Sequence, residues 1–179
     1  LYQQDFCVRY LFESGLLAKV FSYTGQLLYL TNFKHYLTKG MAPSLGWHRD
    51  TYFRGENASG LFPAPYKIVI YSSLSDEKNA CLRVIKGSHR NDIHNRWFDK
   101  ALVLSRLKHK AIVAEAGDVV IFSVNLLHNR SAGRAKSFRS ATIFGMALSS
   151  FYQKNYSHDG NEKIISLYNS LLAQHLELK

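Results

Sequence analysis

The stretch GWHRDT, residues 46–51, places an imidazole and a carboxylate two residues apart. Side chains at positions i and i+2 of a β-strand point to the same face, so His48 and Asp50 can bind one metal ion from a single short segment. Two protein ligands do not complete a metal site. A third ligand is therefore expected from a distant part of the chain that the fold brings back to this pair.

His128 is the best candidate for the third ligand, because it follows a strand-like run at residues 118–124. Two histidines and one carboxylate on one face of a metal form the facial triad of non-heme Fe(II) oxygenases, which leaves coordination positions open for a co-substrate and dioxygen. An isolated His-x-Asp pair is more often a surface ion pair. The metal-site hypothesis therefore depends on support from the remaining sequence.

The two ends of the chain have the periodicity of helices. In residues 1–24 apolar side chains recur every three or four positions, which predicts an amphipathic helix that Gly15 divides into two pieces. Residues 161–178 show the same spacing, and Asn161 stands where an N-cap is expected.

Short segments rich in β-forming residues fill the middle of the chain, with Gly, Pro and polar residues between them. The predicted strands are residues 26–33, 67–74, 81–85, 111–114, 119–124 and 138–148. The predicted connections are a loop at 38–45, an irregular, lid-like segment at 54–65, and a mixture of short helix and loop at 92–107. This pattern predicts a mainly β fold, an antiparallel double-stranded β-helix (jelly roll, cupin-like) with flanking α-helices at the N- and C-termini.

The bulk composition narrows the class of protein. A length of 179 residues suits one domain, residues 1–179, with its core at about residues 26–148. The two cysteines, Cys7 and Cys81, form no Cys-x-x-Cys pair and no signal-like segment opens the chain, so we expect a reducing, cytoplasmic setting. No apolar run approaches the roughly 20 residues needed to cross a bilayer, so no membrane partner is expected.

The net charge of +10 invites a nucleic-acid interpretation, because a basic surface attracts phosphates. The basic residues are scattered, however, and form only two loose groups: Arg83, Lys86, Arg90 and Arg96, and then Arg130, Arg134, Lys136 and Arg139. A solvated basic surface is therefore the first interpretation, attraction of an anionic small substrate the second, and nucleic acid, an unlikely partner, the last.

Arg139 lies eleven residues after His128, on the next predicted strand. From there its guanidinium can point into the same barrel and hold a carboxylate through two parallel hydrogen bonds. An iron triad with a buried arginine is what a 2-oxoglutarate-dependent oxygenase needs. The co-substrate chelates iron through its 2-oxo-acid end, and its far carboxylate must be fixed by a cation.

Four motifs in order resemble those of the phytanoyl-CoA dioxygenase family over residues 39–146. They are WHRD at 47–50, LRVIKGSHR at 82–90, AGDVVIF at 116–122 leading to His128, and the arginine eleven residues later. Each motif alone is weak, and their shared order makes the resemblance specific. The resemblance implies a double-stranded β-helix that uses Fe(II), 2-oxoglutarate and O2, with succinate and CO2 as co-products.

The resemblance also implies roles for individual residues. His48, Asp50 and His128 are expected to hold Fe(II), and Arg139 to bind 2-oxoglutarate. Lys39, nine residues before His48, is similar to a lysine found near that position in many members and is expected to assist. Family halogenases replace the metal-binding carboxylate with a small residue, so the presence of Asp50 favours hydroxylation over halogenation.

The sequence also departs from the family pattern. Lys86 replaces the usual proline before Gly-Ser-His, which should alter a turn more than the chemistry. Ser131 lies one place later than the usual pocket serine, and residues 130–136 carry extra positive charge. The basic segment favours an anionic small molecule as the substrate.

Three alternatives compete with a hydroxylase. A catalytically silent metal-binding jelly-roll module, used for binding or sensing, keeps the fold and lacks the chemistry. A nucleic-acid-binding or nucleic-acid-modifying protein is the second alternative, and it should bind nucleic acid with an affinity that falls steeply as salt rises. A serine or cysteine hydrolase has little support, since neither cysteine lies near a histidine in a known pattern and no Gly-x-Ser-x-Gly elbow occurs.

Overall fold

The computed structural model describes residues 2–50, 66–90, 96–105, 109–147 and 161–177. These residues fall into two compact units, Leu1–Lys34 with Phe144–Lys179, and His35–Ile143. The prediction of one domain with a single core stays a prediction. The predicted lid-like segment at 54–65 lies outside the described residues.

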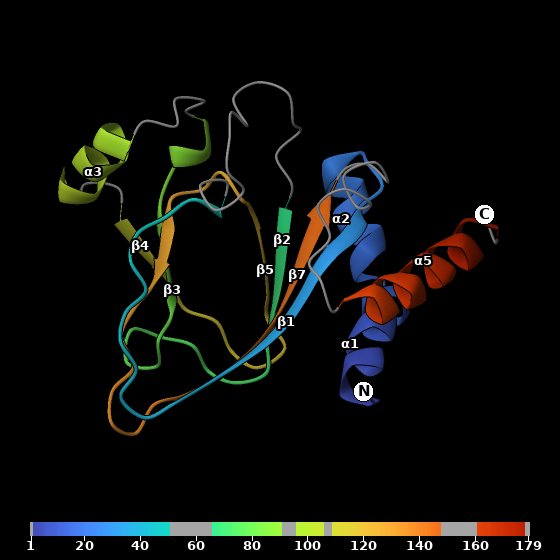
Figure 1. Ribbon diagram of the computed structural model, residues 1–179, viewed down its shortest axis with the longest axis horizontal. Coiled ribbons are helices and arrows are strands. Elements are labelled where there is room, and N and C mark those ends of the chain that lie inside the picture. Colours follow the sequence, from blue (N-terminus) through green and yellow to red (C-terminus); the bar gives the residue numbers. More distant parts are fainter. Residues whose placement is uncertain (1, 51–65, 91–95, 106–108, 148–160, 178–179) are drawn as a thin grey trace. The chain divides into compact units, whose positions relative to one another are not determined.

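Helices lie near both ends of the described chain and between β3 and β4, and strands make up the rest of the regular structure (Figure 1). The helices are α1 (Tyr2–Glu13), α2 (Leu16–Thr24), the 3-10 helix η2 (Ser88–Arg90), α3 (Arg96–Ser105) and α5 (Glu162–Glu177). The strands are β1 (Tyr29–Lys39), β2 (Tyr66–Tyr71), β3 (Leu82–Ile85), β4 (His109–Ile112), β5 (Val119–Ser123), β6 (His128–Arg130) and β7 (Phe138–Ala147). Among the helices described, none has the length and apolar character to span a membrane.

In the first unit, the terminal helices follow the sequence predictions. Gly15 separates α1 from α2 and adopts φ +70°, a left-handed conformation that glycine reaches without steric cost. Asn161 precedes the first residue of α5, as predicted, and its side-chain oxygen accepts a hydrogen bond from the Phe33 amide at 3.3 Å. The predicted break and the predicted helix start are both confirmed.

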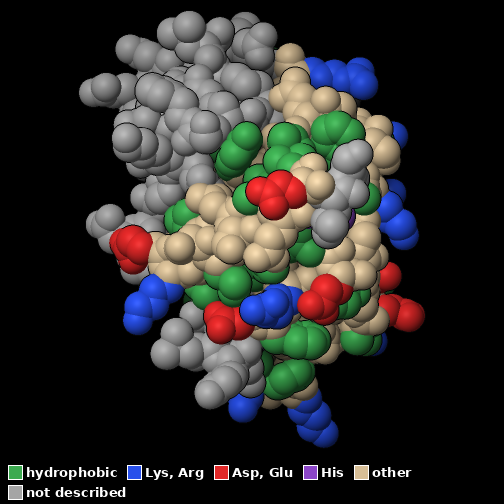
Figure 2. All heavy atoms as spheres, turned by 90° about the vertical axis from the view of Figure 1, so that its right-hand side faces the viewer, with side chains coloured by type: hydrophobic (Ala, Val, Ile, Leu, Met, Phe, Trp, Pro, Cys, Tyr) green, Lys and Arg blue, Asp and Glu red, His purple; other side chains and the backbone are tan. Residues whose placement is uncertain are grey.

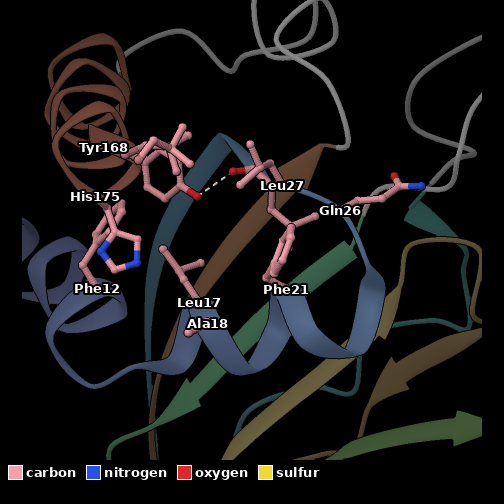
Figure 3. Close-up of a pocket in the computed structure, with 11 residues that line it drawn as sticks. Phe12, Leu17, Ala18, Phe21, Gln26, Leu27, Tyr168 and His175 are labelled. Carbon is pink, nitrogen blue, oxygen red and sulfur yellow. Dashed lines mark hydrogen bonds between the residues drawn. The ribbon is translucent and has the colours of Figure 1, made fainter. Parts of the chain in front are cut away.

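An apolar pocket of about 260 Å³ lies within this first unit (Figure 3). Tyr168 of α5 is fully buried beside it and donates a hydrogen bond to the Leu28 carbonyl at 2.6 Å. The other lining residues are Phe12, Leu17, Ala18, Phe21, Gln26, Leu27, Leu172, His175 and Leu176. None of the residues singled out in the sequence as metal or co-substrate ligands lines this pocket.

Two antiparallel sheets carry the strands. One has four strands in the order β1-β7-β2-β5, which Figure 1 shows side by side, and the other has three in the order β4-β3-β6. Strand β2 pairs with β5 so that Val69 faces Val120, and β3 pairs with both β4 and β6. These antiparallel sheets with flanking helices confirm the predicted jelly-roll class.

A buried cluster in the second unit lies on one face of β2. Val69 and Tyr71 are two residues apart and therefore point to the same side of the strand, where they pack with Ala114 and Ala141. Val120 and Phe122, both on the paired strand β5, and Ile143 of β7 pack against this cluster. Lys67 lies two residues before Val69, so its side chain points to the same, core-facing side of β2 as those of Val69 and Tyr71.

Strand β1 is longer than predicted, strand β4 begins and ends two residues earlier than the predicted 111–114, and strand β6 was not predicted. Strand β1 was expected at residues 26–33 but begins at Tyr29 and continues to Lys39, because β7 supplies hydrogen-bonding partners along it. Strand β6 was not expected, since His-Asn-Arg has low β propensity. It forms because β3 pairs with it, with Val84 opposite His128.

Candidate metal centre

His48, Asp50 and His128 meet at one point of the second unit. One ligand atom from each residue can be chosen so that all three lie within 4.8 Å of one another. His128 Nε2 is 3.6 Å from Asp50 Oδ2, and His48 Nε2 is 3.9 Å from Asp50 Oδ1. The fold therefore brings together the three residues that the sequence analysis selected.

Backbone hydrogen bonds hold the two ligand-bearing segments side by side. His48 and His128 form an antiparallel bridge, with N–O distances of 2.9 and 3.0 Å. The Asp50 amide donates to the Val124 carbonyl at 3.1 Å. The His48–His128 bridge joins two segments that lie about 80 residues apart in sequence. Strand β3 also pairs with β6 at His128 and so supports the same point.

A carbonyl oxygen fixes the orientation of each histidine ring. His48 Nδ1 lies 2.8 Å from the Gly46 carbonyl, and His128 Nδ1 lies 2.8 Å from the Leu126 carbonyl. A carbonyl only accepts hydrogen bonds, so in the neutral ring Nδ1 carries the hydrogen and Nε2 keeps its lone pair. Both lone pairs are thereby available to a metal, in the manner of metal-ligating histidines with an outer hydrogen-bond partner.

The protonation state of His128 suits a metal ligand. Burial lowers its pKa to about 4; the neighbouring Asp50 carboxylate opposes this shift, and the His48 and Lys67 charges add to it. His128 is therefore neutral at pH 7, as ligation requires.

One oxygen of the Asp50 carboxylate lacks, in the described structure, a partner that a metal ion would supply. Asp50 Oδ2 is buried and has no hydrogen-bond partner among the described residues. An unsatisfied carboxylate oxygen in the interior is costly. A divalent cation would satisfy this oxygen together with the two Nε2 lone pairs, so the donor set fits Fe(II).

Arg49, between the two ligands in the sequence, is fully buried. Its Nε and Nη2 donate to the two carboxylate oxygens of Asp99 at 2.8 and 2.7 Å. Its Nη1 donates to the carbonyls of Ser88, at 2.8 Å, and Asn125. This guanidinium links the ligand segment to α3, to η2 and to the turn before His128. The sequence analysis missed it, because nothing in the sequence indicates its partner.

Lys67 was also missed as a site residue. Its Nζ lies 2.8 Å from Asp50 Oδ1, which makes it a direct partner of a predicted metal ligand. The sequence analysis treated it only as the first residue of a strand. Its alternation with the buried Val69 and Tyr71 was the available indication that it points inward.

Arg139 is buried, with 6% of its surface exposed, and its guanidinium carbon lies 5.3 Å from the Tyr71 ring centroid. Its Nε has no hydrogen-bond partner within the described part of the chain. Tyr71 shares the core-facing side of β2 with Lys67, so the metal centre and Arg139 border the same face of that strand.

A second guanidinium lies near Arg139. Burial lowers the pKa of Arg130, and the Arg139 charge lowers it further. Arg130 donates to the Pro43 carbonyl at 2.7 Å and to Thr38 Oγ1 at 3.3 Å, and its Nε is unsatisfied. Neither arginine forms an ion pair with a carboxylate of the described residues. A buried and a half-buried guanidinium near each other, without a carboxylate partner among the described residues, indicate an anion-binding site.

Lys39 is the remaining predicted binding residue. It is the last residue of β1 and its side chain is exposed. No hydrogen bond or ion pair joins its side chain to the residues described. Its assignment to 2-oxoglutarate stays a prediction.

The sequence and the fold were compared with known proteins. The sequence pattern of the phytanoyl-CoA dioxygenase (PhyH) family matches residues 6–141. No curated protein sequence matches the chain. Solved structures with a similar fold include AviO1 from Streptomyces viridochromogenes Tue57, with a TM-score of 0.64 and 18% identity over 75% of this chain and 57% of AviO1.

Two further similar structures contain bound ligands. HygX from Streptomyces hygroscopicus, with nickel and 2-oxoglutarate bound, gives a TM-score of 0.60 and 20% identity over 79% of this chain and 66% of HygX. EctD from S. alaskensis, with 2-oxoglutarate and 5-hydroxyectoine, gives a TM-score of 0.60 and 20% identity over 70% of this chain and 46% of EctD. The chain thus aligns with less than two thirds of AviO1 and less than half of EctD.

Proposed function

The chain belongs to the phytanoyl-CoA dioxygenase family, and from this membership we propose that it is a non-heme dioxygenase that uses Fe(II), 2-oxoglutarate and O2. The observation that carries the proposal is the convergence of His48, Asp50 and His128 with their donor atoms turned toward one another. Bound Fe(II) with 2-oxoglutarate would supply the oxidising power. The chain's own residues hold the metal, orient the co-substrate and set the charge of the pocket.

Arg139 is the proposed partner of the far carboxylate of 2-oxoglutarate. It is buried, incompletely hydrogen-bonded and without a carboxylate partner among the described residues. Arg130 adds a second positive charge to the same region. A dicarboxylate that binds the metal at one end needs a cation for its other carboxylate, and this pair of arginines supports 2-oxoglutarate as the co-substrate. Lys39 keeps its proposed assisting role.

We propose hydroxylation as the reaction outcome. Asp50 provides the third protein ligand, and the position that a halide would need is thereby filled by a carboxylate. The proposed substrate is a small organic molecule, and the basic residues of segment 130–136 favour an anionic one. Both EctD and HygX were solved with 2-oxoglutarate, which is consistent with this class of chemistry.

Nucleic acid remains the less favoured partner. On the face seen in Figure 2, Lys and Arg side chains are interspersed with Asp and Glu side chains. Dense basic tracts are what phosphate backbones require. The cytoplasmic setting stays a proposal, which rests on the two widely separated cysteines, Cys7 and Cys81, that form no Cys-x-x-Cys pair.

The function is tested by anaerobic titration of the purified protein with Fe(II) and then 2-oxoglutarate. A weak visible charge-transfer band is expected when both are bound, and consumption of 2-oxoglutarate with formation of succinate is expected when O2 is admitted. A charge-transfer band without consumption of 2-oxoglutarate would favour the catalytically silent metal-binding module. A folded protein that gives neither would overturn the proposal.

The variant Arg139→Met is expected to weaken 2-oxoglutarate binding by about 30- to 1000-fold, because truncating one partner of a buried charge pair costs about 2 to 4 kcal/mol. The affinity for Fe(II) alone should stay unchanged, since Arg139 contacts none of the three ligands in the described structure. Both affinities can be measured by titrating the anaerobic protein.

Arg134→Met is the matched control, because Arg134 is an exposed arginine of the loose basic group that also includes Arg139. It should leave the 2-oxoglutarate affinity at the wild-type value. Equal weakening in both variants would mean that general positive charge, and not a specific guanidinium, attracts the co-substrate.

A further inference from the structure

Lys67 forms an ion pair with one oxygen of a predicted metal ligand. We propose that Lys67 is a positioning residue that occupies Asp50 Oδ1, so that Asp50 offers the metal only Oδ2. The proposal rests on the proposed Fe(II) and 2-oxoglutarate chemistry and adds a residue that determines how many coordination positions stay open.

The placement of Lys67 on its strand explains why it reaches the site. Lys67, Val69 and Tyr71 alternate along β2 and share its core-facing side, and Lys67 pairs across the sheet with Phe122. Only 20% of the Lys67 side chain is exposed. An ammonium group in such a position is stable only if its charge is paired. Asp50 is that partner, at 2.8 Å.

The two oxygens of Asp50 have different surroundings. Oδ1 accepts the Lys67 ammonium, whereas Oδ2 is buried, lies 3.6 Å from His128 Nε2 and has no hydrogen-bond partner in the described structure. A carboxylate oxygen already engaged by an ammonium is a poorer metal ligand than a free one. The asymmetry therefore makes Asp50 a one-oxygen ligand.

A one-oxygen carboxylate matters for co-substrate binding. With His48 and His128 it takes three positions of an octahedral metal, and three remain for the two donor atoms of 2-oxoglutarate and for O2. If Asp50 bound through both oxygens, it would compete with 2-oxoglutarate for one of those positions. Lys67 should therefore favour co-substrate binding.

Lys67 should lower the affinity of the site for the metal ion, although it favours co-substrate binding. Its positive charge repels a divalent cation bound to the same carboxylate. Removing Lys67 would also remove the hydrogen bond that orients Asp50, which by itself should weaken metal binding. Repulsion between the Lys67 ammonium and a doubly charged ion a few ångströms away is the larger effect. Removing the charge should therefore strengthen metal binding while weakening 2-oxoglutarate binding.

The test uses Co(II) as a redox-stable spectroscopic probe, with Lys67→Met as the main variant. Co(II) affinity is expected to rise about 10-fold, the equivalent of about 1.4 kcal/mol of relieved repulsion, and the affinity of the Co(II) protein for 2-oxoglutarate to fall about 10-fold. The visible Co(II) spectrum of the variant should also differ before 2-oxoglutarate is added, because the coordination number changes.

The controls separate this role from a structural one. Lys110→Met, which replaces an exposed lysine of β4, should leave both affinities at wild-type values. Lys67→Gln, which is neutral but polar, should shift both affinities in the same directions as Lys67→Met and provides a second test if the methionine variant does not fold.

Unchanged affinities in a folded Lys67 variant, or a fall in both, would overturn the role of Lys67 while leaving the proposed function intact. A wild-type protein that binds neither Co(II) nor 2-oxoglutarate would instead refute the proposed function. The two failures are therefore distinguishable.

Discussion

Replacing His128 by alanine is expected to abolish the visible charge-transfer band that Fe(II) and 2-oxoglutarate produce in the wild-type protein. His128 Nε2 is one of three donors at the centre, and its ring is already neutral and oriented by the Leu126 carbonyl. Loss of a hydrogen-bond partner of a metal ligand typically weakens metal binding by about 10- to 100-fold. Loss of the ligand itself should therefore weaken Fe(II) binding by more than this. O2-dependent consumption of 2-oxoglutarate should disappear with the band.

His89→Ala is the matched control, because His89 is an exposed histidine of η2 with no place in the proposed site. It should keep the band and the Fe(II) affinity. His128 also contacts the Phe122 ring, at 5.1 Å between centroids, so the thermal midpoint of each metal-free variant is needed to show that it folds. His48→Ala, at a more exposed position, gives a second test. A folded His48 or His128 variant that retains the full band would refute the triad.

Arg49→Met is expected to lower the free energy of unfolding of the metal-free protein by about 3 to 5 kcal/mol. The substitution would leave the Asp99 carboxylate buried without its bidentate partner. The carbonyls of Ser88 and Asn125 would lose their donor as well. Urea unfolding followed by circular dichroism measures the change, and a loss below about 1 kcal/mol would contradict a structural role for the buried Arg49–Asp99 ion pair.

Two further variants complete the Arg49 test. Arg90→Met replaces an exposed arginine of η2 and should change stability by less than about 0.5 kcal/mol. The double variant Arg49→Met/Asp99→Leu should be more stable than the sum of the two single losses predicts, because it removes both charges of the buried pair together. Additive losses would mean that the two residues act independently.

The sequence by itself determined the class of fold and the candidate ligands. Helical spacing at both ends and short β-rich segments between them predicted a jelly roll with terminal helices, and that class is confirmed. The His48–Asp50 spacing, the place of His128 after a strand and the arginine eleven residues later were all readable, because each depends on residue type and short-range spacing. The assignment of Fe(II) and 2-oxoglutarate to these residues is a proposal that the experiments above test.

Only the tertiary structure decided which segments become strands by pairing with a neighbour, and which charged side chains form ion pairs. Strand β6 forms because β3 lies beside it, and β1 extends to Lys39 because β7 does. Arg49 meets Asp99 fifty residues further along the chain, and Lys67 of β2 meets Asp50 across the connection that follows this ligand. Residue type and local spacing carry no information about such partners, because the register between distant segments selects them.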